Sequence, residues 1–297
     1  MRMMIFGAGY SGKAIGRQMA AQGAIQDIWV GGTSRSAEKA EALRAAGLQP
    51  HIYDGQVLSD ELMQALAGVT HLVQSIAPGR DGDPLIRLFG ETGLRAAMPK
   101  LEWLCYLSTV GVYGDHDGAW VNEETALKPV SARSVERVEA ETAWTALAQR
   151  DGLPLAILRL SGIYGPGRNT FINLEQGTAR RLVKKDQVFN RIRVEDIASA
   201  TAFLAVPRTA GVFNVTDDMP SPPQDVVSEA ARLMGVEAPA EQSFETADLT
   251  PMARSFYGEN KRVSNAKIKA LGFDFHFPNY YQSLQDLLSS GRWNKPA

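Results

Sequence analysis

The stretch Met3-Met4-Ile5-Phe6-Gly7-Ala8-Gly9-Tyr10-Ser11-Gly12 decides the fold of this chain. Its four apolar residues predict a buried strand that leads directly into a G-x-G-x-x-G motif and a helix-length segment. In this setting Gly7 allows a tight turn, Gly9 lets a pyrophosphate approach the backbone, and Gly12 lets the helix pack closely on the strand. The amides at the helix N-terminus then face the anion. We therefore predict that residues 7–12 bind a dinucleotide; the alternative is an incidental glycine-rich turn.

Outward from this loop, short apolar runs alternate with amphipathic segments of helical length through the first half of the chain. We expect strands near residues 3–6, 28–31, 48–53, 71–76, 103–108 and 154–160. We expect helices to begin near Ser11, Ser36, Ser59, Pro84 and Ser131, where Ser can cap a helix and Pro suits its first turn. Strands that alternate with helices form a parallel sheet through right-handed crossovers. The sequence thus predicts an α/β fold with a doubly wound parallel sheet.

The second half of the chain is less regular. The alternation stops after Ile163-Tyr164-Gly165-Pro166-Gly167, and Pro220-Ser221-Pro222-Pro223 breaks the sequence into short elements. We expect a cofactor-binding domain over 1–168 and a smaller substrate lobe over 169–297. A helix-like and a strand-like segment within 189–217 are expected to return to the first domain. No linker separates the two parts, so we expect closely packed lobes.

Composition excludes several classes of protein. The 297 residues carry 31 Lys and Arg against 33 Asp and Glu, a net charge of −2, which predicts no nucleic-acid partner. The apolar run at the N-terminus is too short for a signal peptide or a membrane span. The single Cys105 lies in an apolar run and cannot form an internal disulfide. We therefore expect a cytoplasmic protein with no membrane partner.

The end of the second strand indicates which dinucleotide binds. An NAD site usually places an acidic residue there, about 20 residues beyond the glycine loop, to bind the ribose hydroxyls. This chain has Gly31-Gly32-Thr33-Ser34-Arg35 and no acid. The two hydroxyls and the guanidinium of Thr33, Ser34 and Arg35 suit a 2′-phosphate. We predict a preference for NADP(H), with NAD(H) as the other cofactor to test; the alternative is that Arg35 is only solvated.

Five segments in the same order resemble the extended and atypical short-chain dehydrogenases/reductases of the NAD(P)-dependent epimerase/dehydratase type. They are residues 7–12, 107–115, 158–168, 193–198 and 213–215. The resemblance covers nearly the whole chain and implies a Rossmann-type domain with a C-terminal substrate lobe, and a homodimer. It also implies that Asp54 lies near the adenine and that Ala77 and Pro78 lie near the cofactor ribose. Extended members begin the glycine motif one residue earlier, at the position of Phe6, so this spacing is that of the atypical members.

The resemblance fails at the residues that transfer a proton. The family's Tyr-x-x-x-Lys pair precedes an acidic stretch, and alignment on Glu139-Ala140-Glu141 places Arg133 at the Tyr position and Arg137 at the Lys position. Arginine stays protonated and cannot act as a base. Thr109 aligns with the family's Ser or Thr that binds the substrate oxygen; the alternative is a hydroxyl bonded to the backbone. Tyr113 and Tyr164 are the remaining candidates for the proton donor.

Arg133 and Arg137 lie four residues apart, on one face of the predicted helix. Like charges at that spacing repel by about 0.2–0.5 kcal/mol unless an anion lies between them. We therefore predict a phosphate or carboxylate site there; the alternative is that Arg137 pairs with Glu141 and that Arg133 is solvated. Asn169 and Thr170 are further candidates for substrate contacts, and no residue pattern predicts a metal site.

Two functions remain open from the sequence. The first is an oxidoreductase or epimerase-type enzyme that acts on a small, anionic or sugar-nucleotide substrate with a non-standard proton transfer. The second is a non-catalytic NADP(H)-binding sensor or scaffold. An intact phosphate loop beside a lost acid–base pair is compatible with both, because fold alone does not determine function.

Overall fold

The computed structural model describes residues 1–23 and 27–295. The chain forms two compact units, each assembled from several segments. The first unit contains residues 1–109, 132–159 and 197–213, and the second contains residues 110–131, 160–196 and the chain from residue 214 onward. Within the segment 189–217, residues 197–213 therefore belong to the first unit.

A seven-stranded sheet organises the first unit. Its strand order is β11-β7-β5-β4-β1-β2-β3. The bounds are β1 (Arg2–Phe6), β2 (Trp29–Ser34), β3 (Gln49–Ile52), β4 (His71–Gln74), β5 (Trp103–Thr109), β7 (Leu155–Leu160) and β11 (Gly211–Val215). β1 pairs in parallel with β2 on one side and with β4 on the other. The order therefore reverses at β1, which confirms the doubly wound α/β prediction and places the glycine loop at the switch point.

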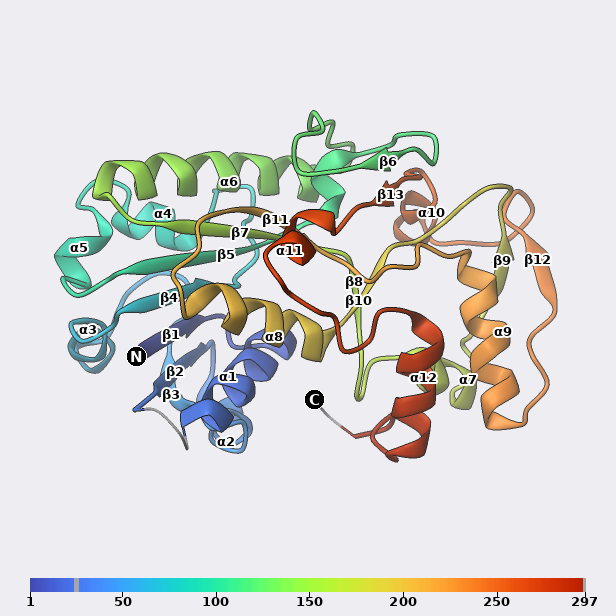
Figure 1. Ribbon diagram of the computed structural model, residues 1–297, viewed down its shortest axis with the longest axis horizontal. Helices are drawn as coiled ribbons and strands as arrows, with labels where there is room; N and C mark the ends of the chain where they lie inside the picture. Colours follow the sequence, from blue (N-terminus) through green and yellow to red (C-terminus); the bar gives the residue numbers. More distant parts are fainter. Residues whose placement is uncertain (24–26, 296–297) are drawn as a thin grey trace. The chain divides into compact units, whose positions relative to one another are not determined.

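Helices cover both faces of this sheet (Figure 1). They are α1 (Tyr10–Gly23), α2 (Ala40–Arg44), α3 (Asp60–Leu66), α4 (Pro84–Phe89), α5 (Leu94–Ala97), α6 (Ala132–Asp151) and α8 (Val194–Ala205). The expected start at Ser59 is confirmed, because its side chain accepts a hydrogen bond from Leu62 N at 3.2 Å. At Ser36 the chain instead forms a 3₁₀ turn, η1 (Ala37–Lys39), and the Ser36 side chain makes no capping bond.

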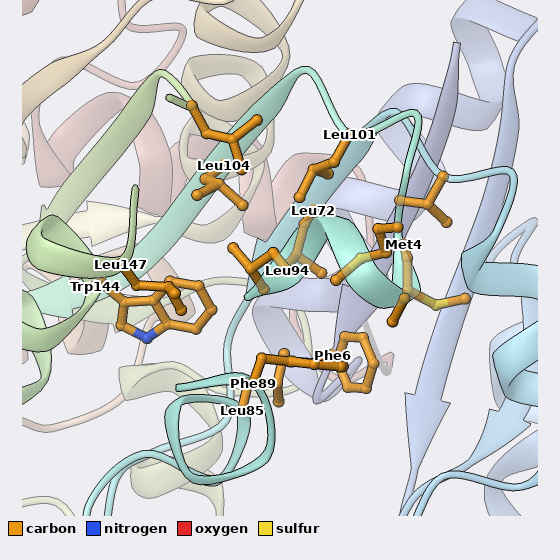
Figure 2. Close-up of a cluster of buried hydrophobic side chains, with 14 of the residues drawn as sticks. Met4, Phe6, Leu72, Leu85, Phe89, Leu94, Leu101, Leu104, Trp144 and Leu147 are labelled. Carbon is orange, nitrogen blue, oxygen red and sulfur yellow. The ribbon is translucent and has the colours of Figure 1, made fainter. Parts of the chain in front are cut away.

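A hydrophobic core fills the space between the sheet and α4, α5 and α6 (Figure 2). β4 contributes Leu72 and β5 contributes Leu104, while Trp144 and Leu147 come from α6. Six of the seven residues of β5 are buried, as a central parallel strand covered on both faces requires. Cys105 lies in this strand, and burial raises the pKa of its thiol, which keeps it protonated.

The second unit is built mostly from short elements. Its strands are β6 (Trp120–Val121), β8 (Gly162–Tyr164), β9 (Arg181–Val183), β10 (Arg191–Arg193), β12 (Glu241–Ser243) and β13 (Arg262–Val263). They form three two-stranded parallel pairs: β10 with β8, β12 with β9 and β13 with β6. The helical segments are η2 (Val110–Tyr113), α7 (Thr170–Glu175), α9 (Pro223–Met234), α10 (Pro251–Phe256), α11 (Ala266–Ala270) and α12 (Tyr280–Ser289). Phe171, Tyr280, Leu284 and Leu287 are among the residues of its core.

None of the helices within residues 1–23 and 27–295 combines the length and the apolar character that a membrane span needs.

Candidate functional site

The glycine loop follows β1 in the geometry that its motif predicts. Gly7 has φ 77°, and a Cβ at this position would lie 2.7 Å from Ile76 Cγ1 and 2.9 Å from Ile76 N. A Cβ at Gly12 would lie 3.1 Å from Ile5 Cγ2, so α1 packs closely on β1. Gly9 is exposed, and the nearest atom to its added Cβ is 3.9 Å away. Thus Gly7 and Gly12 are required by the fold, whereas Gly9 leaves its backbone open to a ligand.

Thr33 holds this loop to the neighbouring strand. Gly7 N donates to Thr33 Oγ1 and Ala8 N donates to the Thr33 carbonyl, both at 2.9 Å. The side chain of Thr33 is buried, so it positions the loop, which differs from the expected contact with a 2′-phosphate. Ser34 is half-buried and its hydroxyl donates to the Ser36 carbonyl at 2.7 Å. Both hydroxyls lie at the predicted strand end, but each forms a hydrogen bond with a backbone group.

Positive charges gather beside the same strand end. Arg35 directly follows β2 and is exposed. Lys13, on the first turn of α1, is half-buried, and burial lowers its pKa. The charges of Arg17 and Lys39 lower the pKa of Lys13 further, so cations act on it from both α1 and the turn after β2. Such a group of like charges favours the binding of an anion.

The residues that the family resemblance places near the cofactor all belong to the first unit. Asp54 follows β3, is exposed, and accepts a hydrogen bond from Gln56 N at 2.9 Å. Ala77 is exposed and Pro78 is buried, in the loop after β4. Tyr10, half-buried, and Ser11, buried, begin α1. These strand and loop ends follow β1, β3 and β4, so they meet at the carboxyl edge of the parallel sheet.

A closed polar network lies beneath the end of β5. Ser108 Oγ donates to Glu141 Oε1 at 2.5 Å, and Arg159 Nη2 donates to Glu141 Oε2 at 2.7 Å. All three side chains are buried. The buried charges of Glu141 and Arg159 are therefore paired and hydrogen-bonded, as stability requires. Thr109 follows Ser108 as the last residue of β5 and is half-buried.

The ion pair that we considered between Arg137 and Glu141 is not formed, because Glu141 pairs with Arg159. Arg137 Nη1 instead donates to the Leu107 carbonyl at 2.5 Å and to the Tyr106 hydroxyl at 3.2 Å. Its guanidinium carbon lies 5.7 Å from the centre of the Tyr106 ring. These contacts hold the half-buried Arg137 at the carboxyl end of β5. Arg133, one turn earlier on α6, is exposed.

The two candidate tyrosines lie in the second unit and are buried at their hydroxyls. Tyr113 OH donates to Asn214 Oδ1 at 2.7 Å, and the whole side chain is inaccessible to solvent. Tyr164 OH is buried and has no hydrogen-bond partner of good geometry among the described residues. Ser283 Oγ lies near it and already accepts a hydrogen bond from Arg193 Nη1 at 2.9 Å. Burial raises the pKa of Tyr164, so it holds its proton firmly.

Asn169 and Thr170 lie where α7 begins. Asn169 Oδ1 accepts hydrogen bonds from Phe171 N and Ile172 N, and its amide donates to the carbonyls of Gly165 and Trp293. The Asn169 side chain thus caps the helix and is fully used by the fold, which leaves it no free polar atom for a substrate. Thr170 is half-buried.

A cavity of about 470 Å³ opens elsewhere in the second unit, between the end of α7 and the turn after α9. Its lining contains none of the predicted site residues. It is formed by Leu174, Glu175, Gly177, Ala179, Met234, Val236, Glu237, Ala238, Pro239 and Ala240.

Two groups of polar residues in the structure are not predicted by the sequence analysis. Arg159 interrupts the apolar run Leu158-Arg159-Leu160, and a charge inside a buried strand is a signal of a buried ion pair. Arg191 and Asp217 lie in the second unit near Tyr164, and each influences the pKa of the other. No sequence signal identified Asp217, because an Asp beside a predicted strand usually lies in an exposed turn.

A known protein family matches the part of the chain that contains the glycine loop and the seven-stranded sheet. The family model for the NAD dependent epimerase/dehydratase family matches residues 3–215. This chain belongs to that family. The match begins at β1 and ends at β11, so it spans the strands of the seven-stranded sheet and includes Arg133 and Arg137.

Three proteins that are similar to this chain differ in their sequence identity to it. A solved structure of a functionally unknown conserved protein from Silicibacter pomeroyi is 46% identical, with a TM-score of 0.89 over 98% of this chain and 99% of that one. Protein YeeZ of Escherichia coli K12 is 26% identical over 94% of this chain and 97% of its own length. The dTDP-glucose 4,6-dehydratase of Bacillus anthracis, solved with NAD, is 18% identical, with a TM-score of 0.76 over 100% and 99% of the two chains. That last likeness shows the fold alone.

Proposed function

We propose that this protein is an NADP(H)-dependent enzyme, an oxidoreductase or epimerase of the atypical short-chain dehydrogenase/reductase type. Its substrate is a small, anionic molecule. The observation that carries the proposal is the Gly7–Gly12 loop, held in its turn by Thr33, beside a strand end that has no acid. When bound, the nicotinamide supplies or accepts a hydride.

The cofactor choice rests on charge. Arg35 directly follows the strand at whose end NAD-binding proteins place an acid to bind the ribose hydroxyls, and Lys39 lies in the next turn, where its charge acts on Lys13. A 2′-phosphate at this position would relieve the mutual repulsion of these cations and form charge-assisted hydrogen bonds. The exposed backbone of Gly9 would face the diphosphate.

The chemistry at the substrate oxygen needs a route other than the missing tyrosine. Thr109 at the end of β5 would hold that oxygen by its hydroxyl. Arg137, fixed by the Leu107 carbonyl, would donate hydrogen bonds from its remaining N–H groups and balance negative charge. Neither side chain is a base at neutral pH, so in this proposal solvent exchanges the proton with the substrate oxygen: it donates the proton when a carbonyl is reduced and accepts it when an alcohol is oxidised.

A second function is favoured by one observation. The hydroxyls of Tyr113 and Tyr164 are both buried, and Arg133 stands at the usual tyrosine position. A protein that binds NADP(H) without turning it over, as a sensor or scaffold, needs no proton donor.

A binding titration tests the cofactor proposal. We expect the wild type to bind NADPH more tightly than NADH, and Arg35→Ala to lose about tenfold or more in NADPH affinity while NADH affinity stays the same. Arg44→Ala removes an exposed arginine from α2 and is the matched control. Equal NADPH affinity in the wild type and Arg35→Ala would remove the proposal.

Gly9→Ala separates the cofactor loop from the fold. Its Cβ would meet no atom closer than 3.9 Å, so we expect the free energy of unfolding to change little. The same methyl would stand where a diphosphate approaches, so NADPH affinity should fall about tenfold or more. An unchanged affinity in a folded Gly9→Ala variant would contradict the assignment of the loop.

Turnover distinguishes the two functions. We expect NADPH oxidation with at least one member of a panel of carbonyl acids and nucleotide sugars, and its loss in Thr109→Val. Stoichiometric NADPH binding without consumption across the panel would favour the sensor.

A further inference from the structure

A second group of polar side chains, all within the second unit, lies where β8, β10 and the segment after β11 meet. Gly162 pairs with Arg191 and Tyr164 pairs with Arg193 in the parallel register of β8 and β10. Asp217 N donates to the Arg191 carbonyl at 2.8 Å. Ser161 lies immediately before β8, and its N–H donates to the Val215 carbonyl at 3.2 Å. This backbone arrangement brings Ser161, Tyr164, Arg191 and Asp217 together; we call these four residues the β8–β10 cluster.

Three polar atoms of the β8–β10 cluster are buried and make no hydrogen bond of good geometry within the described part of the chain, although the Ser283 hydroxyl lies close to one of them, Tyr164 OH. They are Ser161 Oγ, Tyr164 OH and Asp217 Oδ2. The other carboxyl oxygen of Asp217 accepts a hydrogen bond from Met219 N at 3.1 Å. Buried polar atoms are rarely left unsatisfied in folded proteins, and three at one junction indicate that the junction receives a polar group.

The two arginines of β10 differ in whether a carboxylate neutralises their charge. Arg193 donates to Glu195 and Asp286, each at 2.8 Å, and so is neutralised by two carboxylates. Arg191 donates only to the carbonyls of Phe189 and Ser221, and it forms no ion pair with any carboxylate in residues 1–23 and 27–295. Arg191 is half-buried, and a guanidinium withdrawn from water is costly unless an anion accompanies it.

We propose that the β8–β10 cluster binds an anionic oxygen group, a carboxylate or a phosphate, of the enzyme's substrate. This proposal rests on the proposed function for the identity of the ligand as substrate. The Arg191 guanidinium supplies the charge, and the hydroxyls of Ser161 and Tyr164 donate hydrogen bonds to the anion. Tyr164 is thereby a binding residue, and its proton stays on its oxygen.

Asp217 determines the pH at which this site works. Burial raises the pKa of its carboxyl to about 8, although the nearby charge of Arg191 opposes the shift. The carboxylates of Asp218 and Asp196 raise that pKa further, and Tyr164 faces Asp217 from β8. Below its pKa the neutral carboxyl can donate its O–H to an anion, and above it the carboxylate repels one. Anion affinity should therefore fall as the pH rises through about 8.

The test uses the full chain without cofactor, so it does not depend on whether NADPH binds. Acetate, whose charge is constant over this range, is titrated calorimetrically at about pH 6.5 and about pH 9.5, on either side of the pKa of about 8. Inorganic phosphate is titrated at the lower pH only and separates phosphate from carboxylate preference. We expect one site per chain and acetate affinity about tenfold or more weaker at the higher pH.

Three variants and one control locate the site. Arg191→Gln should abolish binding, and Tyr164→Phe, which removes only a hydroxyl, should weaken it about fivefold or more. Asp217→Asn should bind at both pH values and lose the pH dependence. Lys185→Gln removes an exposed charge from the same unit and should bind like the wild type.

Three outcomes would overturn the proposal. One is that the wild type binds neither probe. Another is that Tyr164→Phe, and Arg191→Gln if it folds, bind as well as the wild type. The third is that Asp217→Asn keeps the pH dependence. Anion binding without any turnover would contradict the enzyme proposal while leaving the site intact.

Discussion

Two arginines, one in each unit, lie on β-strands but have different surroundings: Arg159 is buried and Arg191 is half-buried. Arg159 of β7 meets the Glu141 carboxylate at 2.7 Å, and Ser108 completes the network. Among the residues that the structure describes, Arg191 of β10 donates only to carbonyls, while Ser161 and Asp217 beside it carry atoms without a hydrogen-bond partner. The first network therefore stabilises the fold, whereas the second keeps hydrogen-bonding capacity for a ligand. Substitutions in the two networks should therefore have different, even opposite, effects on stability.

The largest expected effect is at Glu141. Glu141→Ala leaves the Arg159 charge buried and unpaired, so we expect the free energy of unfolding to fall by about 3–5 kcal/mol. Urea denaturation followed by circular dichroism measures the change. Glu139→Ala, an exposed position on the same helix, should change it by less than about 0.5 kcal/mol. Equal losses in the two variants would mean that the first network does not stabilise the fold.

Asp217→Asn should have the opposite sign. The folded pKa of about 8 lies above the ordinary value of 3.8, so the stability that Asp217 contributes is lost as the pH rises between these values. Asparagine keeps the oxygen that accepts from Met219 N and has no charge to bury. We expect the variant to be more stable than the wild type by about 2–3 kcal/mol near pH 8, and the difference to vanish near pH 4.

Denaturation of the wild type and Asp217→Asn across that range, with no added carboxylate or phosphate, checks this expectation. A destabilised variant at pH 8 would show that Asp217 is ionised and pairs with Arg191, which would make the two networks alike.

The smallest expected difference in the free energy of unfolding is between the alanine variants of two serines. Ser108 Oγ donates to a buried carboxylate at 2.5 Å, so Ser108→Ala should cost about 1–2 kcal/mol. Ser161 Oγ has no partner among the described residues, so Ser161→Ala should change the free energy of unfolding by less than about 0.5 kcal/mol. The same denaturation assay measures both variants, and equal costs would contradict the difference between the networks.

Much of the first unit could be predicted from local sequence. The strands at 3–6, 103–108 and 154–160 were found within one or two residues, because buried parallel strands are short apolar runs with few alternatives. Gly7 was identified by its place after such a run, and the structure shows why a side chain there would collide with Ile76. These inferences use neighbours in the chain, for which spacing is sufficient information.

The hydrogen-bond and ion-pair partners of the polar side chains could not be predicted in this way. Thr33 was expected to face a phosphate and instead receives the Gly7 N–H, because β2 lies directly beside β1. The helical spacing of Arg137 and Glu141 suggested an ion pair, yet Arg159, on β7, takes that carboxylate. A carboxylate in a buried site pairs with whichever cation the packing brings to it, and sequence spacing does not contain that information.

The parallel sheet, the glycine loop and the lack of an acid after β2 can all be read from the amino-acid sequence, because each depends on residues adjacent along the chain. Which of the charges inside the fold are neutralised depends instead on the tertiary structure. Arg159 and Arg191 both lie in strands, but Arg159 meets the Glu141 carboxylate on α6, whereas Arg191 meets the carbonyls of Phe189 and Ser221. The difference between a closed and an open polar network is therefore a property of packing.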